Sequence, residues 1–250
     1  MKKFIVAALL VLILPARVFA EDITVAAAAN VQFVLEELSQ AFQKASGVSV
    51  KPVIGSSGKL TTQIENGAPF DLFLSADTEY PETIYQEGLA VSKPKVYAYG
   101  ILILWTMKDI DLSAGVKGLT AEQVRKIAVA NPQTAPYGRE AVNAIKYFKL
   151  YPALDRKLVY GENVSQVNQF VVSSAADVGF TAKSVVMAEN MKGKGVWVEV
   201  DRQSYRPMAQ AVVLLAYGQK HHGQAAQKFL DFLFTDTARE IFKKYGYILP

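Results

Sequence analysis

Short apolar runs alternate with amphipathic helical stretches along this sequence, and that alternation limits the possible fold more than any other feature. Residues 23–28 and 71–75 have the apolar character of buried strands, and residues 48–54 are predicted to be a strand whose Pro52 indicates an edge or an end. Each of the three precedes a stretch with helical spacing. Asn30 is placed to open the first helix and Gly47 to end it. Strands that alternate with helices form a parallel sheet with helices on both faces, so an α/β fold is expected. The apolar face of the first helix consists of Val31, Val34, Leu35, Leu38 and Phe42.

The same alternation returns in the second half of the chain. An uninterrupted apolar run over residues 98–107 is predicted to be one strand that leads into it. Two α/β units of this size form two lobes, and a cleft between lobes is a preferred ligand site. We therefore predict one lobe from residues 21–98 plus 206–250, and a second from residues 99–205. Further strands are predicted at residues 127–130, 157–160, 178–181, 196–200 and 211–216, and helices at residues 137–149, 164–173, 183–190, 224–234 and 236–245.

The first twenty residues have the pattern of a secretory signal peptide. Two lysines precede an apolar run over residues 4–14, and small residues stand at the positions that signal peptidase reads before a cut after Ala20. The apolar run is shorter than the about 20 residues that span a membrane. The mature chain is therefore predicted to start near Glu21 and to be exported to the periplasm. Because no cysteine follows the apolar run, no lipid anchor is expected.

Composition limits the chemistry of the mature chain. Without residues 1–20, which hold three basic residues and no acidic one, the formal net charge falls from +4 to +1. A near-neutral chain does not favour a nucleic-acid partner, which needs a clustered basic surface. The chain has no cysteine, and its two histidines, His221 and His222, are adjacent in a polar helix-start segment, where solvated helix residues are expected. Since neighbours on a helix point about 100° apart, a shared metal ion is not expected there.

Four predicted strand-to-helix junctions are rich in small and hydrogen-bonding residues. In an open α/β sheet such junctions converge outside the carboxyl ends of the strands, where ligands bind. Helix starts present free backbone amides and a positive dipole end, which favour an anion. The alternative is that Asn30 and Ser57 are only helix N-caps, and that the chain is a protein-interaction module without a ligand. The junctions are residues 28–31, 55–60, 131–138 and 161–164.

The second junction, GSSGK at residues 55–59, also permits two enzyme interpretations. A phosphate-binding loop is not supported, because Val53 stands where its first glycine is needed and Leu60 where its Ser or Thr is needed. Ser56 and Lys59 match the SxxK spacing of penicillin-interacting enzymes, but the companion SDN and KTG motifs are missing from the sequence. A secreted hydrolase that uses Ser56 or Ser57 with Lys59 is kept as a less favoured alternative, and no enzyme activity is expected.

Longer runs of the sequence resemble the periplasmic molybdate-binding proteins of molybdate ABC transporters, a family of bacterial solute-binding proteins. The resemblance covers essentially the whole mature chain. It is most specific in GSSGKLTTQIENGAPFDLFLSAD at residues 55–77. Further matches are ITVAAAANV at residues 23–31, NPQTAPYGREA at residues 131–141 and AREIFKKYGY at residues 238–247.

The resemblance implies a two-lobed, type II periplasmic binding protein that closes on molybdate or tungstate in the interlobe cleft. The implied partner is an inner-membrane ABC permease, the protein is expected to be a monomer, and molybdenum enters only as the oxyanion, without a cofactor. In such proteins neutral hydrogen-bond donors hold the dianion. The larger size of molybdate and tungstate selects them over the smaller sulfate ion. Sulfate, another tetrahedral oxyanion, or a small organic acid clamped by Arg139 or Arg206 is the alternative ligand.

Carried over position by position, the resemblance implies a set of ligand-binding residues. Asn30 stands where members have Ser or Asn, Ser57 matches the serine of the second junction, and Tyr137 and Val164 match backbone donors of the other two. Ala29 and Ala182 complete the set. Some members have a Tyr where this chain has Ala182, so one phenolic donor is missing, and Tyr137 is the candidate to replace it in part.

Overall fold

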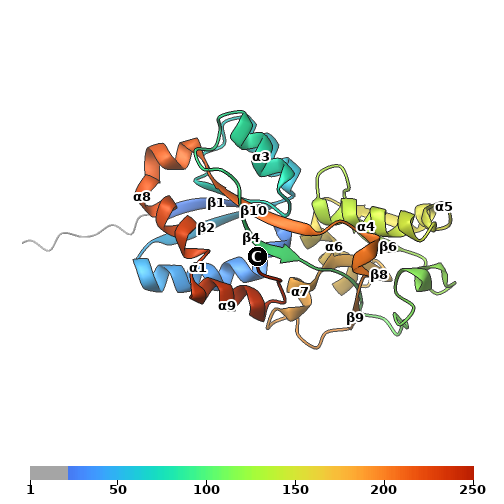
Figure 1. The fold of residues 1–250 in the computed structure, drawn as a ribbon. Helices are drawn as coiled ribbons and strands as arrows, with labels where there is room; N and C mark the ends of the chain where they lie inside the picture. Colours follow the sequence, from blue (N-terminus) through green and yellow to red (C-terminus); the bar gives the residue numbers. More distant parts are fainter. Residues whose placement is uncertain (1–21) are drawn as a thin grey trace, which may run out of the picture.

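The structure, a computed structural model, describes residues 22–250. The predicted signal peptide lies outside the described residues. Two five-stranded mixed sheets, each covered by helices, form two lobes that lie side by side (Figure 1). In order across the first sheet, the strands are β2 (Ser49–Gly55), β1 (Asp22–Ala28), β3 (Leu72–Leu74), β10 (Met208–Leu214) and β4 (Lys95–Gly100). Across the second they are β7 (Leu158–Gly161), β6 (Ile127–Ala130), β8 (Val178–Ala182), β5 (Leu102–Thr106) and β9 (Val196–Glu199).

Both sheets have the same topology. In the first, β2, β1 and β3 are parallel, and β10 runs antiparallel between β3 and β4. In the second, β7, β6 and β8 are parallel, and β5 runs antiparallel between β8 and β9. One reversed strand in each sheet is what a chain needs to pass between two otherwise parallel units. The predicted two-lobed α/β fold with mainly parallel sheets is confirmed.

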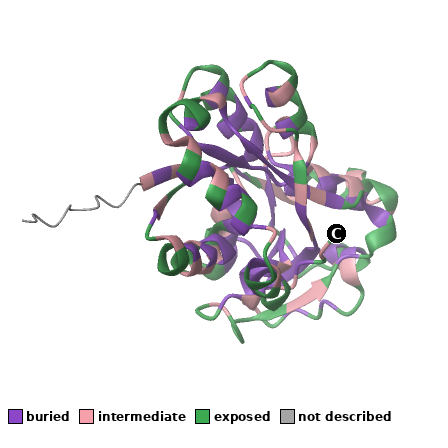
Figure 2. Cartoon of the chain, turned by 60° about the vertical axis from the view of Figure 1, so that its left-hand side comes forward, coloured by how far each residue is buried: buried purple, intermediate pink, exposed green. Residues whose placement is uncertain are grey.

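Helices cover both faces of each sheet, as the apolar patterns predicted. The apolar face of α1 is buried at Val34, Leu35, Leu38 and Phe42, and Gly47 ends the helix with a left-handed φ of 76°. Figure 2 shows the buried residues concentrated along the strands and the inner faces of the helices. The helices are α1 (Gln32–Ser46), α2 (Ser57–Glu65), α3 (Glu79–Gln86), α4 (Pro136–Tyr147), α5 (Tyr151–Leu154), α6 (Val164–Val172), α7 (Lys183–Met187), α8 (Ala216–Phe232) and α9 (Asp236–Lys244), with 3-10 turns η1 (Ala29–Val31), η2 (Gly115–Thr120), η3 (Asp155–Lys157) and η4 (Arg202–Ser204).

The chain passes between the two sheets at two places. The apolar run over residues 98–107 is not one strand: β4 ends at Gly100, β5 begins at Leu102, and the two belong to different sheets. The prediction of a single strand was wrong because both strands are buried and apolar, so hydropathy alone does not mark the change of sheet. The return lies between β9 and β10, close to the predicted return near Arg206.

Two helices in the C-terminal half of the chain also differ from their predicted bounds. Helix α7 ends at Met187 rather than at residue 190. Helix α8 begins at Ala216, earlier than residue 224, and bends at His222, whose φ of −137° and ψ of 34° are not helical. The His222 Nδ1 atom lies 2.8 Å from Oδ1 of the buried Asp71, so this histidine is partly buried rather than a solvated helix residue.

Each lobe has its own apolar core. Trp105 on β5 is fully buried in the core of the second lobe. The first lobe has a cluster on each face of its sheet, one under α1, α8 and α9 and the other under α2 and α3. On the first of these faces Phe42 packs edge to face against Phe229, with ring centroids 5.0 Å apart. Within residues 22–250, no helix is long and apolar enough to cross a membrane.

Candidate functional site

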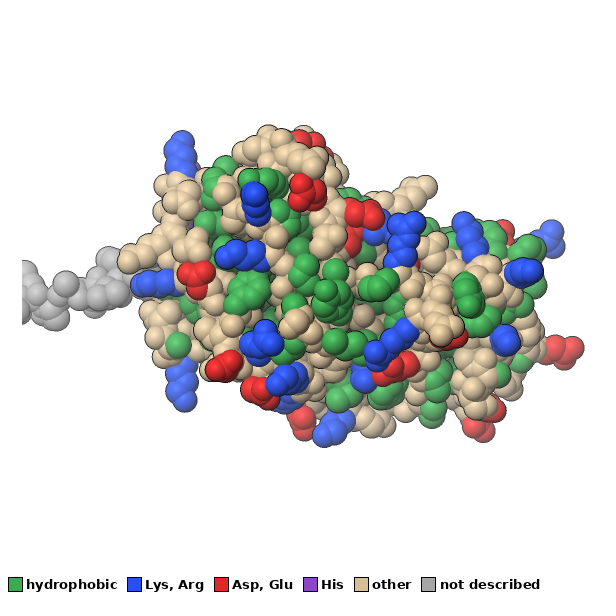
Figure 3. All heavy atoms as spheres, viewed as in Figure 1, with side chains coloured by type: hydrophobic (Ala, Val, Ile, Leu, Met, Phe, Trp, Pro, Cys, Tyr) green, Lys and Arg blue, Asp and Glu red, His purple; other side chains and the backbone are tan. Residues whose placement is uncertain are grey.

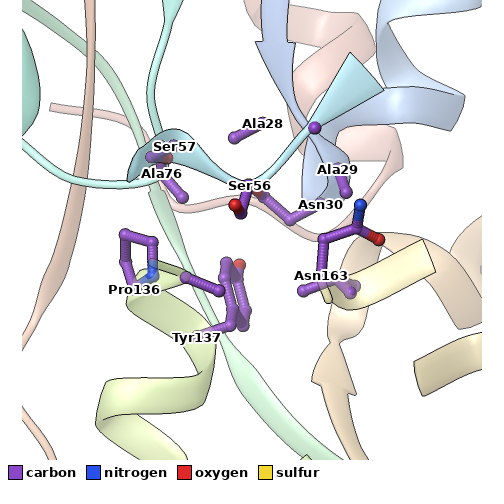
Figure 4. A pocket seen from close by; sticks show the side chains of 12 residues that line it. Ala28, Ala29, Asn30, Ser56, Ser57, Ala76, Pro136, Tyr137 and Asn163 are labelled. Atoms are coloured by element: carbon purple, nitrogen blue, oxygen red, sulfur yellow. The ribbon is translucent and has the colours of Figure 1, made fainter. Parts of the chain in front are cut away.

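One small cavity between the lobes brings all four predicted junctions together (Figure 4). The cavity volume is about 10 Å³, far below the about 300–1,000 Å³ of sites for drug-sized ligands, so this one suits an ion or a molecule of few atoms. Its lining consists of Ala28, Ala29, Asn30, Gly55, Ser56, Ser57, Ala76, Ala135, Pro136, Tyr137, Asn163 and Val164.

The cavity offers hydrogen-bond donors but no fixed charge. Among the described residues, none that lines it has a charged side chain. Helices α2, α4 and α6 all begin at its wall, with Ser57, Pro136 and Val164 as their first residues. The first amides of a helix have no partner within the helix and carry its positive dipole end. The wall therefore suits an anion held by neutral groups.

The two serines of the second junction lie at this wall and have different partners. The Ser57 hydroxyl accepts a hydrogen bond from the backbone amide of Ala76 at 3.0 Å, which leaves its own proton to donate. The Ser56 hydroxyl is buried and has no hydrogen-bond partner within the protein. Ser56 holds the N-cap position of α2 without a capping hydrogen bond from its side chain. Ser57 is the first residue of α2 rather than its N-cap, so the interpretation of Ser57 as only an N-cap is wrong.

Asn30 lines the cavity from η1, but its side-chain amide bonds to buried residues behind the cavity wall. Its Nδ2 donates to Gln210 Oε1 at 2.9 Å and to the Tyr247 hydroxyl at 3.4 Å. Its carbonyl accepts hydrogen bonds from the hydroxyls of Ser184 at 2.8 Å and Tyr247 at 3.1 Å. Asn30 does not cap α1, whose N-cap is Val31. Its side chain therefore fixes the turn, and its backbone amide is the group left to meet a ligand.

Tyr137 and Val164 reach the cavity from the second lobe. Tyr137 is the second residue of α4 and is 2% exposed, and Val164 opens α6. Asn163, just before Val164, caps α6 by accepting a hydrogen bond from the Gln166 amide at 3.1 Å. Burial raises the pKa of Tyr137 well above its usual range, so the phenol stays protonated and able to donate.

The lobes touch around the cavity, so the cleft is closed. The Gly58 amide donates to the Thr134 carbonyl at 2.8 Å, and the Tyr80 hydroxyl donates to the Gln133 carbonyl at 3.2 Å. On the opposite side the Ser165 hydroxyl donates to Gln32 Oε1 at 2.6 Å.

The chain is similar in sequence and in structure to proteins of one family. A family model for bacterial extracellular solute-binding proteins matches residues 23–248. The chain belongs to this family. It is 38% identical to a molybdate-binding protein, ModA, of Rhodobacter capsulatus, over 92% of this chain and 89% of that one. It is 36% identical to ModA of Azotobacter vinelandii, over 91% of this chain and 90% of that one. A solved structure of an Azotobacter vinelandii periplasmic molybdate-binding protein superposes with a TM-score of 0.86 at 33% identity, covering 91% of this chain and 99% of that chain.

The resemblance to periplasmic molybdate-binding proteins is thereby confirmed, and the cavity shows where the predicted residues lie in this solute-binding protein. Asn30, Ser57, Tyr137, Val164 and Ala29 meet there. Ala182 is not among the lining residues. It is fully buried at the end of β8, where it pairs with Leu102 on β5.

Sequence reasoning missed several lining positions. Ser56, Asn163, Gly55 and Pro136 belong to the predicted junctions, so their place in those motifs was the available signal. Ala76 follows the short strand β3 and lies outside every predicted junction. It becomes part of the wall through its hydrogen bond to Ser57, which no local pattern reveals.

The arginine proposed as a clamp for an organic acid is engaged elsewhere. Arg139 bonds Asp77 and Glu79 of the first lobe at 2.9 Å each and lies 3.5 Å from Glu140. Burial raises the pKa of Asp77 although the hydrogen bond from Arg139 opposes this. Neither Arg139 nor Arg206 lines the cavity. The organic-acid alternative thus has no arginine at the site.

The enzyme alternatives find no support in the geometry around Lys59. Its ammonium pairs with Glu162 at 2.9 Å, and both side chains are about half exposed. No lysine and no other basic side chain lines the cavity beside Ser56 or Ser57. In the part of the chain that the structure describes, no group of three or more His, Cys, Asp or Glu side chains could hold a metal ion.

Proposed function

We propose that this protein is a periplasmic receptor that captures molybdate, and equally tungstate, and delivers it to an inner-membrane ABC permease. One observation carries the proposal: four helix-start junctions from two lobes form a closed, uncharged cavity lined by hydrogen-bond donors. Relatives of similar length that are 36–38% identical bear the name of molybdate-binding proteins. The periplasmic location is supported by the signal-peptide pattern and by the name of the solved Azotobacter protein.

Neutral donors can hold a dianion when enough of them replace its water. Hydrogen bonds to a charged acceptor are about twice as strong as neutral ones, and about six or seven would surround a tetrahedral ion. The candidate donors are the Ser56 and Ser57 hydroxyls and the backbone amides at the starts of η1, α2, α4 and α6, including those of Ala29, Asn30, Tyr137 and Val164.

Donor chemistry and size together set the selectivity of such a site. Hydrogen phosphate carries a proton that needs an acceptor, and a cavity of donors offers it little. Sulfate has the same shape as molybdate but is smaller, so the same donors would be stretched. Molybdate and tungstate are nearly equal in size and should bind alike.

A binding protein, not an enzyme, is the function that this site supports. The cavity lacks a nucleophile with an adjacent base, and molybdenum would enter only as the oxyanion, without a separate cofactor. Basic and acidic side chains are intermixed on the face shown in Figure 3, which fits a monomeric carrier better than a nucleic-acid-binding protein.

Isothermal titration calorimetry of the mature protein with molybdate, tungstate, sulfate and phosphate tests the proposal. We expect tight one-to-one binding of molybdate and tungstate, with sulfate at least 100-fold weaker, a difference of about 2.7 kcal/mol. Equal or tighter binding of sulfate would move the protein to the sulfate alternative. If none of the four ions gives a heat of binding, the proposal of an oxyanion receptor is rejected altogether.

A further inference from the structure

A buried polar network behind the cavity joins its two walls through one side chain. Gln210 lies on β10, one of the strands near the passage between lobes, and is fully buried. Its Oε1 accepts hydrogen bonds from Asn30 Nδ2 at 2.9 Å and from the Tyr97 hydroxyl at 3.0 Å. Its Nε2 donates to the Tyr137 hydroxyl at 3.2 Å. One amide therefore contacts a cavity residue from each lobe.

This arrangement fixes the direction in which the Tyr137 phenol can donate. Its oxygen already accepts a hydrogen bond from Gln210, so its proton needs a different acceptor. The side chain of Tyr137 borders the cavity, and Figure 4 shows its hydroxyl at the end of the ring nearest Ser56. An oxyanion in the cavity would supply the missing acceptor.

Gly100, at the end of β4, leaves the room for this pair. A Cβ atom at this position would overlap both the Tyr137 hydroxyl and Gln210 Nε2. The phenol and the amide thus lie directly against the backbone of the interlobe passage. Their contact depends on a residue with no side chain there.

We propose that the Tyr137 hydroxyl donates a hydrogen bond to the bound oxyanion and that Gln210 is the positioning residue that directs it there. This inference rests on the proposed function. It connects ligand occupancy to β10, the strand that follows the return passage between the lobes.

Tyr97 provides a matched control for this proposal. Like Tyr137, it is a buried phenol bonded to the Gln210 amide, but its one proton is shared between two acceptors inside the protein, Gln210 Oε1 at 3.0 Å and the Ser75 carbonyl at 3.1 Å, and it does not line the cavity. Tyr97→Phe and Tyr137→Phe each remove one buried hydroxyl from the same network. A structural role alone would make the two variants equally defective.

The experiment is calorimetry with sodium molybdate on the wild type, Tyr137→Phe, Tyr97→Phe, Gln210→Met and the double variant Tyr137→Phe/Gln210→Met, with melting of each ligand-free protein. We expect Tyr137→Phe to weaken binding about 10- to 100-fold and Tyr97→Phe to change it by less than about threefold, because only the former loses a hydrogen bond to a charged group. Gln210→Met should weaken binding more in the wild type than in Tyr137→Phe, because the part of its effect that acts through that hydroxyl is already lost there and only the part through Asn30 is left.

The results distinguish the proposed function from the roles of the Tyr137 hydroxyl and of Gln210. A wild type that binds neither molybdate nor tungstate overturns the proposed function. A wild type that binds, with Tyr137→Phe of equal affinity, overturns only the role of the phenol. Fully additive losses in the double variant overturn the positioning role of Gln210. If Tyr137→Phe does not fold, Gln210→Met tests the proposal in its place. The proposal then requires Gln210→Met to weaken molybdate binding more than Tyr97→Phe does, and equal affinities would contradict it.

Discussion

Ser56 and Ser57 are adjacent, carry the same side chain and have different tasks at the site. The Ser56 hydroxyl has no partner inside the protein, so Ser56→Ala should leave the melting temperature of the free protein nearly unchanged. It should weaken molybdate binding by about 1.5–3 kcal/mol, the value of a hydrogen bond to a charged group, or roughly 10- to 150-fold. Calorimetry paired with differential scanning calorimetry measures both quantities.

Ser57→Ala is the matched comparison, since it also removes the partner of a buried amide. The Ala76 N–H would then be left unpaired, which costs about 1–3 kcal/mol of folding free energy. We expect this variant to lose both stability and affinity. A Ser56→Ala protein that melts as early as Ser57→Ala would show that Ser56 has a structural task instead. The sequence predicted that this motif lines the site, but only the contact with Ala76 distinguishes the two hydroxyls.

Asp177, at the start of β8, gives a prediction for acid stability. Its Oδ2 accepts hydrogen bonds from the amides of Arg125 and Lys126, both at 2.7 Å, and its Oδ1 pairs with Lys108 at 2.5 Å. Burial acts to raise its pKa, but these hydrogen bonds outweigh burial, and the pKa is lowered from 3.8. The charged form is therefore favoured by folding, and its contribution is complete above about pH 4 and lost as pH falls below that value.

Asp177→Asn should accordingly be less stable than the wild type by about 1–3 kcal/mol at pH 7, and the difference should shrink at pH 3. Urea unfolding at the two pH values measures it. Asp111→Asn is the control, because that carboxylate bonds only Ser113 in an exposed turn. A difference between the Asp177 variant and the wild type that is the same at both pH values would contradict the assignment.

At the scale of elements, local patterns predicted most strands and helices but not the change of sheet within the apolar run over residues 98–107. β1 and α1 are recognisable because their apolar residues have a period and Gly47 ends the helix. The division of the 98–107 run at Ile101 depends on which sheet each half joins, a tertiary fact that has no local signal. The same holds for α8, whose polar first turns start at Ala216 because the preceding strand ends there.

Helix α2 also gives a way to test closure of the cleft. Gly58, its second residue, lies so close to the other lobe that a Cβ atom would be 3.0 Å from the Thr134 Cα atom. The same Cβ atom would be 2.7 Å from the hydroxyl of Tyr80, which lies on α3 of the same lobe and is the end of a flexible side chain that can move aside. Gly58→Ala should therefore hinder closure against Thr134 while leaving the open form and α2 itself intact, since alanine favours helices. We expect roughly tenfold weaker molybdate binding, about 1.4 kcal/mol, without a lower melting temperature of the ligand-free protein.

Calorimetry and thermal melting measure these two effects for Gly58→Ala. Gly223→Ala is a suitable control, because it also adds a Cβ atom to a helix, near only the flexible side chain of Gln219. Unchanged affinity in Gly58→Ala would mean that the closed contact with Thr134 is not required for binding.

At the scale of the whole molecule, Arg139 forms the more buried of the ion pairs that join the lobes, while the Lys59–Glu162 pair is about half exposed. It extends from α4 and bonds Asp77 and Glu79 of the first lobe, while Asp77 is mostly buried. Truncating one partner of a buried pair leaves the other charge uncompensated, whereas exposed pairs contribute little. The Asp77 contact should therefore dominate, and breaking it should favour the open form.

Arg139→Met should release molybdate about 3- to 30-fold faster than the wild type, equivalent to about 0.7–2 kcal/mol, with little change in the association rate. Stopped-flow displacement by excess tungstate measures the release rate, and small-angle scattering should show a larger radius of gyration at subsaturating ligand. Arg202→Met is the matched control, because its ion pair with Glu199 lies within the second lobe. The two lobes are separate cores joined by few covalent passages, so contacts across the cleft, rather than contacts within either core, should govern how long the ligand stays bound. If Arg139→Met and Arg202→Met release the ion at the same rate as the wild type, closure depends on the ligand and on the other contacts across the cleft rather than on Arg139.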